Sequence, residues 1–230
     1  MHPDLVYLST KSSNGELIYS LRAVEKYGIN FGKLVIVGHL PFNLKQDIYI
    51  PQINNKGHYK SRDMFEKINL VAQNPDVSES FVRMSDDYFF SDVIDFATMP
   101  TYIRDYDLLT QGSNAPTNKN NMVAGETGRA LLAKRLPIVS YDLHTPMKMD
   151  KTGFREIARA FDWTKPLSLA IRSVYGNYHR IPGIVKKDIK FGRYYDFEMV
   201  SKEPIWSTGD MYWCVKTMEK MYPNKSRWEI

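Results

Sequence analysis

Cysteine is almost absent from this chain of 230 residues, which contains only Cys214. A single cysteine excludes an intramolecular disulfide and any metal cluster held by several thiolates. We expect Cys214 to fill the core on a helix rather than to act as a nucleophile. No apolar run approaches the ~20 residues of a membrane span, and the N-terminus lacks the basic and then apolar pattern of a signal peptide. We therefore expect a soluble, cytoplasmic protein without a membrane span, located in the host cytoplasm if the chain is viral.

Several widespread active-site motifs are missing as well. The tripeptide at 32–34, Gly-Lys-Leu, lacks the upstream glycine of a phosphate-binding loop. The chain has no Gly-x-Ser-x-Gly elbow of the α/β-hydrolases and no glycine-rich dinucleotide motif. Zinc-finger and metalloprotease spacings are absent too. Any chemistry must therefore be carried by a less regular set of residues.

The composition is that of one large globular domain. Hydrophobic residues make up 43% of the chain and include 15 Tyr, 11 Phe and 4 Trp, enough to bury a substantial core. The formal charge of +5 is moderately basic. Such a charge suits an anionic partner such as a nucleotide, a phosphorylated glycan or a nucleic acid, but it selects none of them.

The first half of the chain alternates strand and helix signals. We expect strands at 5–8, 33–38, 47–50 and 81–84, one helix opened by a capping box at 13–16 and closed by Gly28, and a second helix at 62–74. This alternation favours an α/β fold with a mostly parallel central sheet flanked by helices. Ligands bind outside the carboxyl ends of such strands.

The second half is less regular. A polar stretch at 110–121 predicts a loop that serves as a lid or contacts an acceptor, followed by a basic helix at 123–134. We expect a strand at 137–142, helices at 152–160 and 211–221, and an apolar segment at 168–172. We assign residues 1–95 to a nucleotide-binding α/β half and residues 96–230 to an acceptor and catalytic half of a single domain.

Two adjacent carboxylates, Asp86 and Asp87, directly follow the predicted strand at 81–84. Like charges so close together raise each other's pKa unless a cation offsets the repulsion. Mg²⁺ and Mn²⁺ prefer oxygen ligands and bridge carboxylates to substrate phosphates. The pair therefore predicts a site for a metal ion and a diphosphate, and the alternative is a solvated turn between two strands.

Three further polar residues lie at the ends of predicted elements. His144 could act as a general base or a metal ligand, or it could be satisfied by a backbone partner. Arg172 could clamp a diphosphate, or it could form an ion pair with an Asp. Asp210 precedes the last helix, where a helix cap is favoured over a role in the site.

Four segments carry a resemblance to a known family. They are 16–37, with the pattern Glu-Leu-Ile-Tyr-Ser-Leu-Arg and then Lys-Leu-Val-Ile-Val, 81–90, 144–151 with His-Thr-Pro, and 221–229. In order and spacing they resemble the conserved regions of the Stealth family of capsular-polysaccharide phosphotransferases, which includes the lysosomal-enzyme N-acetylglucosamine-1-phosphotransferase, and a short phage-type form in particular. Arg172 falls where that family keeps a functional arginine, and Asp210 resembles part of its last region.

The resemblance implies a glycosyltransferase-A-like fold, a nucleotide-sugar donor and a divalent metal. Carried over to this chain, it implies Asp87, His144 and Arg172 as catalytic residues. Asp86, Asp87 and His144 would then bind Mg²⁺ or Mn²⁺. For the donor, with a UDP-sugar favoured, we expect binding by Arg172 together with Ser9, Arg22 and Lys60.

Two departures from the family pattern affect the donor site. Ser85 stands where the family has Asn, and the family's Asp-rich first region is reduced to 4–13. These departures leave open whether the enzyme transfers a sugar or a sugar phosphate, and we place glycosyl transfer slightly ahead. The acceptor could be a glycan or a base of phage DNA, whose phosphates could be contacted by Lys186, Lys187, Lys190 and Arg193. The alternative is a non-catalytic module that binds sugar or nucleic acid on a degenerate transferase fold.

Overall fold

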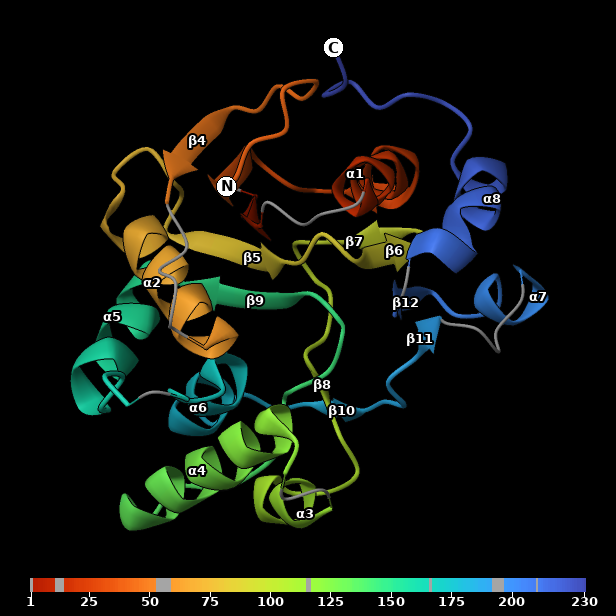
Figure 1. Ribbon diagram of the computed structural model, residues 1–230. Helices are drawn as coiled ribbons and strands as arrows, with labels where there is room; N and C mark the ends of the chain where they lie inside the picture. Colours follow the sequence, from red (N-terminus) through yellow and green to blue (C-terminus); the bar gives the residue numbers. More distant parts are fainter. Residues whose placement is uncertain are drawn as a thin grey trace.

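A five-stranded sheet forms the centre of the protein (Figure 1). The structure, a computed structural model, describes residues 2–10, 15–52, 59–114, 117–165, 167–191, 197–209 and 211–230, and it describes only the backbone of 211–213. The strand order is β4 (Ile48–Pro51), β3 (Leu34–Gly38), β1 (Asp4–Ser9), β5 (Ser80–Met84) and β9 (Met147–Asp150). The first four strands are parallel, and β9 runs antiparallel to β5. The predicted α/β class with a mostly parallel sheet is therefore confirmed.

Helices cover both faces of this sheet. The helices among the described residues are α1 (Glu16–Tyr27), α2 (Lys60–Gln73), α3 (Leu108–Ser113), α4 (Lys119–Ala133), α5 (Lys151–Ala160), α6 (Ile171–Tyr178), α7 (Phe197–Val200) and α8 (Met211–Met221). Figure 1 shows α1 and α8 on one side of the sheet and α2, α5 and α6 on the other. Within the described ranges, no helix is both long and apolar enough to cross a membrane.

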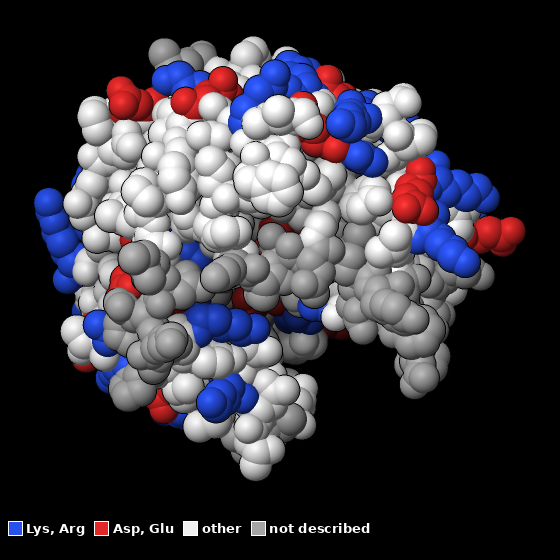
Figure 2. All heavy atoms as spheres, turned by 45° about the horizontal axis from the view of Figure 1, so that its top comes forward, with Lys and Arg blue, Asp and Glu red and all other residues white. Residues whose placement is uncertain are grey.

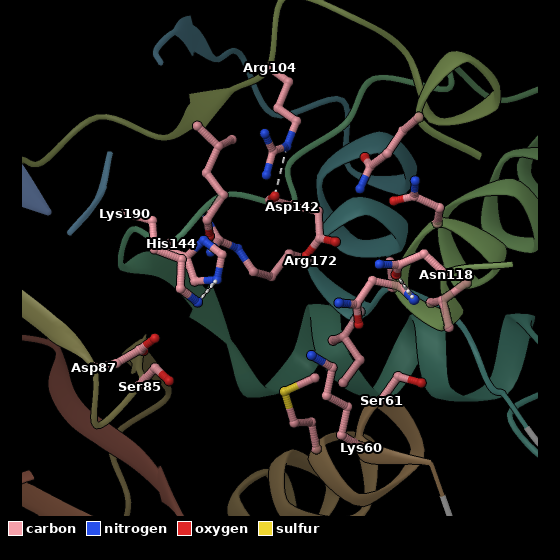
Figure 3. Close-up of a pocket in the computed structure, with 18 of the residues that line it drawn as sticks. Lys60, Ser61, Ser85, Asp87, Arg104, Asn118, Asp142, His144, Arg172 and Lys190 are labelled. Atoms are coloured by element: carbon pink, nitrogen blue, oxygen red, sulfur yellow. Dashed lines mark hydrogen bonds between the residues drawn. The ribbon is translucent and has the colours of Figure 1, made fainter. Parts of the chain in front are cut away.

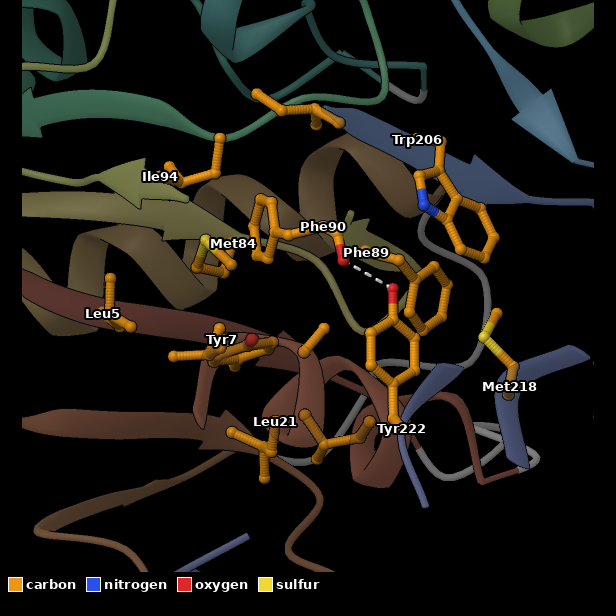
Figure 4. Close-up of a cluster of buried hydrophobic side chains, with 14 of the residues drawn as sticks. Leu5, Tyr7, Leu21, Met84, Phe89, Phe90, Ile94, Trp206, Met218 and Tyr222 are labelled. Atoms are coloured by element: carbon orange, nitrogen blue, oxygen red, sulfur yellow. Dashed lines mark hydrogen bonds between the residues drawn. The ribbon is translucent and has the colours of Figure 1, made fainter. Parts of the chain in front are cut away.

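The alternation of side chains along the central strands divides the core into two clusters. On β1, Leu5 and Tyr7 pack with α1 and α8, whereas Val6 and Leu8 pack with α2, α5 and α6. Figure 4 shows the first cluster, where the hydroxyl of Tyr222 donates a 2.7 Å hydrogen bond to the backbone oxygen of Phe90. Both predicted halves of the chain contribute residues to each cluster.

Short strands extend this framework beyond the end of β5. A three-stranded sheet joins β11 (Lys190–Phe191), β12 (Ile205–Thr208) and β6 (Tyr88–Phe90) in that order. Two-stranded pairs join β2 (Gly28–Ile29) with β7 (Ile94–Asp95), and β8 (Tyr102–Ile103) with β10 (Ile184–Val185). The three-stranded sheet holds in place the residues that follow Asp86 and Asp87, and it includes Lys190.

The expected strands at 5–8, 33–38, 47–50 and 81–84 are confirmed as β1, β3, β4 and β5, and the helices at 62–74, 123–134, 152–160 and 211–221 as α2, α4, α5 and α8. Gly28 ends α1 as predicted, since its N–H donates to the oxygen of Val24. Ser13, the expected cap of α1, lies outside the described residues, and the N-cap position is Gly15 in a left-handed conformation. Cys214 is buried on α8, as expected.

Two predictions were wrong. The predicted loop at 110–121 contains most of α3 and the start of α4, because the side chains of Asp107 and Asn118 cap these helices. The predicted strand at 137–142 makes only an isolated bridge at Val139. Its backbone is bound by side chains of α6 instead, and the strand that joins the sheet is β9.

Candidate active site

A cavity of about 520 Å³ lies outside the carboxyl end of β5 (Figure 3). Its walls are formed by the residues after β5, the first residues of α2 and α6, segment 142–144, parts of α3 and α4, and β11. These segments come from most of the length of the chain. Their meeting point is the carboxyl edge of the parallel strands, where α/β folds bind their ligands.

Four of the residues predicted to act in catalysis or to bind the metal or donor line this cavity: Lys60, Asp87, His144 and Arg172. Figure 3 shows Asp87 and Ser85 at the lower left, His144 and Lys190 above them on the same side, Arg172 near the centre and Lys60 at the bottom. Asp86, Ser9 and Arg22 are not among the lining residues. The structure thus joins an acid, an imidazole and a guanidinium in one site.

Asp86 and Asp87 form the turn between β5 and β6. Burial raises the pKa of the Asp86 carboxyl to about 7, and repulsion by Asp87 and Glu16 acts in the same direction. A weak 3.4 Å hydrogen bond from Ser85 Oγ opposes this rise only in part. Negative charge at the end of β5 is therefore not balanced by cations of the described residues, which favours a bound cation.

The carboxylates of Asp86 and Asp87 fit Mg²⁺ or Mn²⁺, because these ions bind through one or two carboxylates and complete their shell with water and substrate phosphate oxygens. Across the described residues, no three His, Cys, Asp or Glu side chains come close enough together to hold a metal ion alone. The expected ligand set of Asp86, Asp87 and His144 is therefore not assembled, and His144 lies in a separate network.

His144 is held by Asp188, a residue that the sequence analysis did not identify. The backbone N–H of His144 donates to Asp188 Oδ1 at 2.8 Å, and Nδ1 lies 2.9 Å from Asp188 Oδ2. Arg104 Nη2 donates to the same Oδ2 at 2.7 Å. Burial alone would raise the pKa of Asp188, but the hydrogen bonds from His144 and the charge of Arg104 hold it well below its usual range. An ionised Asp188 fixes the imidazole with the proton on Nδ1.

The other ring nitrogen of His144 faces Lys190. Figure 3 marks this contact between Nε2 and the Lys190 ammonium, 3.3 Å apart. An ammonium can only donate, so Nε2 acts as the acceptor and carries its lone pair. Lys190 is exposed on the surface, so it can move aside for a substrate hydroxyl.

Arg172 enters the cavity from the first turn of α6. It is only 5% exposed and donates to the backbone oxygen of Leu143, to Thr145 Oγ1 at 3.1 Å and to Tyr88 Oη at 3.3 Å. Burial lowers the pKa of its guanidinium, and the charge of Arg83 acts in the same direction. The alternative expectation of an ion pair with an Asp is not met among the described residues.

Ser9 and Arg22 lie in other surroundings. Ser9 is fully buried at the end of β1, where its backbone oxygen accepts a 3.0 Å hydrogen bond from Lys67 Nζ. Arg22 forms two hydrogen bonds to the Glu229 carboxylate, at 2.8 and 2.6 Å. This ion pair joins α1 to the C-terminal segment, so the structure gives Arg22 a role in packing rather than a place in the cavity.

The expected contacts to nucleic acid that the structure describes differ in their surroundings. Lys186 pairs with Glu203 at 3.2 Å, Lys187 is exposed, and Lys190 lines the cavity. Arg193 and Asp210 lie outside the described residues. On the face in Figure 2, Lys and Arg side chains alternate with Asp and Glu, and both kinds border the hollow below a broad uncharged area. The described residues of this face form no continuous basic stripe of the kind typical of a DNA-binding surface.

Sequence reasoning missed Arg83 and Tyr88, which also line the cavity. A usable signal existed for Arg83, because a charged residue inside the apolar run at 81–84 requires a special environment. Asp188 gave no such signal, since it lies in a polar stretch between lysines.

Comparison of the chain with protein-family models gives no match, and neither does comparison with curated proteins.

Proposed function

We propose that this protein is a metal-dependent transferase that uses a nucleotide-activated sugar and that the cavity beside β5 is its active site. One observation carries the proposal: Asp87, His144 and Arg172, from three distant segments, line one cavity at the carboxyl edge of a parallel sheet. The strand order and the antiparallel β9 support a glycosyltransferase-A-like fold as part of the same proposal. A cytoplasmic location also belongs to it.

On the acceptor side, His144 serves as the general base. Asp188 holds the imidazole so that the Nε2 lone pair faces the cavity, and a hydroxyl that displaces Lys190 can donate its proton there. The carboxylate of Asp188 stabilises the imidazolium that forms, as in other histidine-carboxylate pairs. The acceptor is thus a hydroxylated molecule that reaches into the cavity.

On the donor side, the cations bind the diphosphate. Arg172 presents a buried guanidinium, and Lys60 adds an ammonium from the first turn of α2. Asp86 and Asp87 provide oxygen ligands for Mg²⁺ or Mn²⁺, which when bound offsets charge that grows on the departing phosphate oxygens. Asp87 and Arg172 line the same cavity, and this supports a metal held by the two carboxylates beside the diphosphate.

Both reaction types use these groups. Attack at the anomeric carbon expels a nucleoside diphosphate, whereas attack at the sugar-bearing phosphorus expels a nucleoside monophosphate. We favour glycosyl transfer, with a UDP-sugar as donor and a glycan or a base of DNA as acceptor. The mixed charge beside the hollow in Figure 2 supports the glycan more than the nucleic acid.

The test is incubation with a panel of activated sugars and Mn²⁺, followed by mass spectrometry of the nucleotide products. We expect slow release of nucleoside diphosphate from one donor, lost when Mn²⁺ is chelated. His144→Ala should abolish transfer to an acceptor, whereas His2→Ala should not, because His2 is exposed at the opposite end of β1. Binding of a sugar or nucleic acid without release of any nucleotide would favour the non-catalytic module instead.

A further inference from the structure

Arg83 and Arg172 place two buried positive charges beside each other in the cavity wall. Arg83 lies on strand β5 and is 7% exposed, and Arg172 on α6 is 5% exposed. Their side chains meet at one hydroxyl group: Arg83 Nη1 donates to Tyr88 Oη at 2.6 Å, and Arg172 Nη1 donates to the same oxygen at 3.3 Å. The two charges are close enough that Arg83 helps to lower the pKa of the Arg172 guanidinium.

Neither guanidinium forms an ion pair with a carboxylate of the described residues. Among the described residues, the remaining partners are Met64 Sδ for Arg83, and Thr145 Oγ1 and the Leu143 backbone oxygen for Arg172. The Nε of Arg172 is buried and has no hydrogen-bond partner among the described residues. A buried charge without a counter-charge is strongly destabilising, so this arrangement needs a reason.

The more exposed arginines show the opposite pattern. Side chains that form ion pairs with carboxylates are 16 to 62% exposed; they belong to Arg22, Arg62, Arg104, Arg129, Arg155 and Arg227. Desolvation makes a counter-charge most necessary for the buried arginines, yet these lack one. Asp142 and Asp188 stabilise the charge of Arg172 only from beyond ion-pair distance, and Asp188 already binds Arg104 and His144.

Arg83, Tyr88 and Arg172 together offer only hydrogen-bond donors to a ligand. A guanidinium can only donate, so Tyr88 Oη accepts from both arginines, and its own proton remains available for an acceptor. Arg172 Nε offers another N–H that is not used. A ligand that fits must carry several acceptor oxygens, no donor where it meets these groups, and about two negative charges.

We infer that Arg83, Tyr88 and Arg172 form an anion subsite that binds a phosphoryl group. The two guanidiniums bind it directly, and the Tyr88 hydroxyl holds them in position. Phosphate oxygens match the planar guanidinium in geometry and charge. The inference that this subsite binds phosphate does not depend on the proposed transferase activity. Only the statement that the phosphate is the diphosphate of the sugar donor rests on the proposed function. A phosphate monoester on the acceptor is the other source.

The test is isothermal titration calorimetry of the full chain in EDTA, with inorganic pyrophosphate, inorganic phosphate, UDP, UMP and acetate as probes. We expect pyrophosphate to bind and acetate not to bind. If the source is the donor diphosphate, UDP binds more tightly than UMP; if it is a phosphate monoester, inorganic phosphate and UMP bind as tightly as UDP. Failure of the wild-type protein to bind either pyrophosphate or phosphate overturns the subsite.

Variants locate the binding within the cavity. Arg83→Gln should weaken pyrophosphate binding by ~10- to 100-fold, because it removes a charged donor, and Tyr88→Phe should weaken it less. Arg129→Gln is the matched control, since Arg129 is exposed and pairs with Glu126, and it should bind as the wild type does. Wild-type affinity in both Arg83→Gln and Tyr88→Phe would overturn the subsite.

Thermal unfolding separates an anion site from a packing role. Without anions, Arg83→Gln should not lower Tm, because it removes an unpaired buried charge. A lower Tm together with unchanged pyrophosphate binding in Tyr88→Phe would show a structural role and contradict the inference. Pyrophosphate binding without any sugar transfer would refute the proposed function alone, whereas sugar transfer by a protein that binds no phosphate would refute the subsite alone.

Discussion

The Asp188 carboxylate binds His144 twice, through the backbone N–H at 2.8 Å and through Nδ1 at 2.9 Å. If His144 is the general base, Asp188→Asn should lower kcat by ~10-fold or more, because the amide no longer fixes the tautomer or stabilises the imidazolium. His144→Ala should cost ~10²- to 10⁴-fold. Steady-state rates of nucleotide release in the presence of acceptor measure both effects.

The control for the Asp188→Asn and His144→Ala variants is Glu203→Gln, which removes the carboxylate of an ion pair with Lys186 outside the cavity. It should leave kcat unchanged. Equal rates for wild type and Asp188→Asn would remove His144 from the mechanism as a base.

A second prediction concerns Asp86, whose pKa is raised to about 7 in the folded protein. Between about pH 4 and pH 7 the Asp86 carboxyl is protonated in the folded protein but ionised in the unfolded chain. The free energy of unfolding therefore falls as the pH rises through this range and does not fall further above about pH 7. The loss amounts to at most ~4 kcal/mol. Chemical unfolding in EDTA at several pH values measures it.

Asp86→Asn should flatten this dependence, so that the variant is more stable than the wild type at pH 8 and similar to it at pH 4. Mn²⁺ should stabilise the wild type more at pH 8 than at pH 5, because it binds the ionised carboxylate. Parallel stability curves for wild type and Asp86→Asn across this range would contradict the account of the acidic turn.

Arg22 gives a third prediction, since the structure pairs it with Glu229 rather than with a ligand. Arg22→Met should lower the free energy of unfolding by ~1–3 kcal/mol, because the Glu229 side chain is nearly buried and, among the described residues, would keep only Ser226 as a hydrogen-bond donor. The KM for the sugar donor should not change. Arg227→Met, at an exposed ion pair with Glu25, serves as the matched control with an expected loss below ~1 kcal/mol. A raised KM of Arg22→Met for the sugar donor would show that Arg22 contributes to donor binding and would contradict this prediction.

Gly176 on α6 gives a fourth prediction. A Cβ at this position would lie 2.6 to 2.7 Å from ring atoms of Tyr141, in the segment that leads to His144. Gly176→Ala should therefore destabilise the protein by ~1–3 kcal/mol, although alanine is the better helix former. It should also lower kcat, because the displaced ring shifts the segment that carries His144.

Gly125→Ala on α4 is the control, because its nearest neighbours would be 3.6 Å away, an ordinary contact. We expect it to be neutral or stabilising by up to ~1 kcal/mol in urea unfolding. Destabilisation of equal size in both variants would show that the close packing of Tyr141 on α6 has no special part in placing His144.

The first half of the fold could be predicted because each element carries its own local signal. Strand β3 is a run of apolar and β-branched residues, and α1 ends at Gly28. The segment at 137–142 has an equally good strand signal but does not join the sheet. Its backbone is bound by Asn177 and Ser173, which lie more than thirty residues further along the chain, and no local pattern reveals that competition.

The site was predictable only in part for the same reason. Asp87, His144 and Arg172 stand out as polar residues beside apolar segments, and each of them lines the cavity. Asp188 acts through contacts that exist only once the chain has folded, and nothing in its neighbourhood marks it. Arg22 shows the converse, because its position on a predicted helix could not reveal that Glu229 would be its partner.

The central claim is that Asp87, Arg172 and the donor diphosphate meet in one cavity, and a crystal structure with UDP and Mn²⁺ tests it most directly. The account predicts an anomalous manganese peak at the carboxylates of Asp86 and Asp87, with diphosphate oxygens ~2.7–3.2 Å from Arg172 nitrogens. UDP bound elsewhere on the protein, with no manganese at the acidic turn, would contradict it.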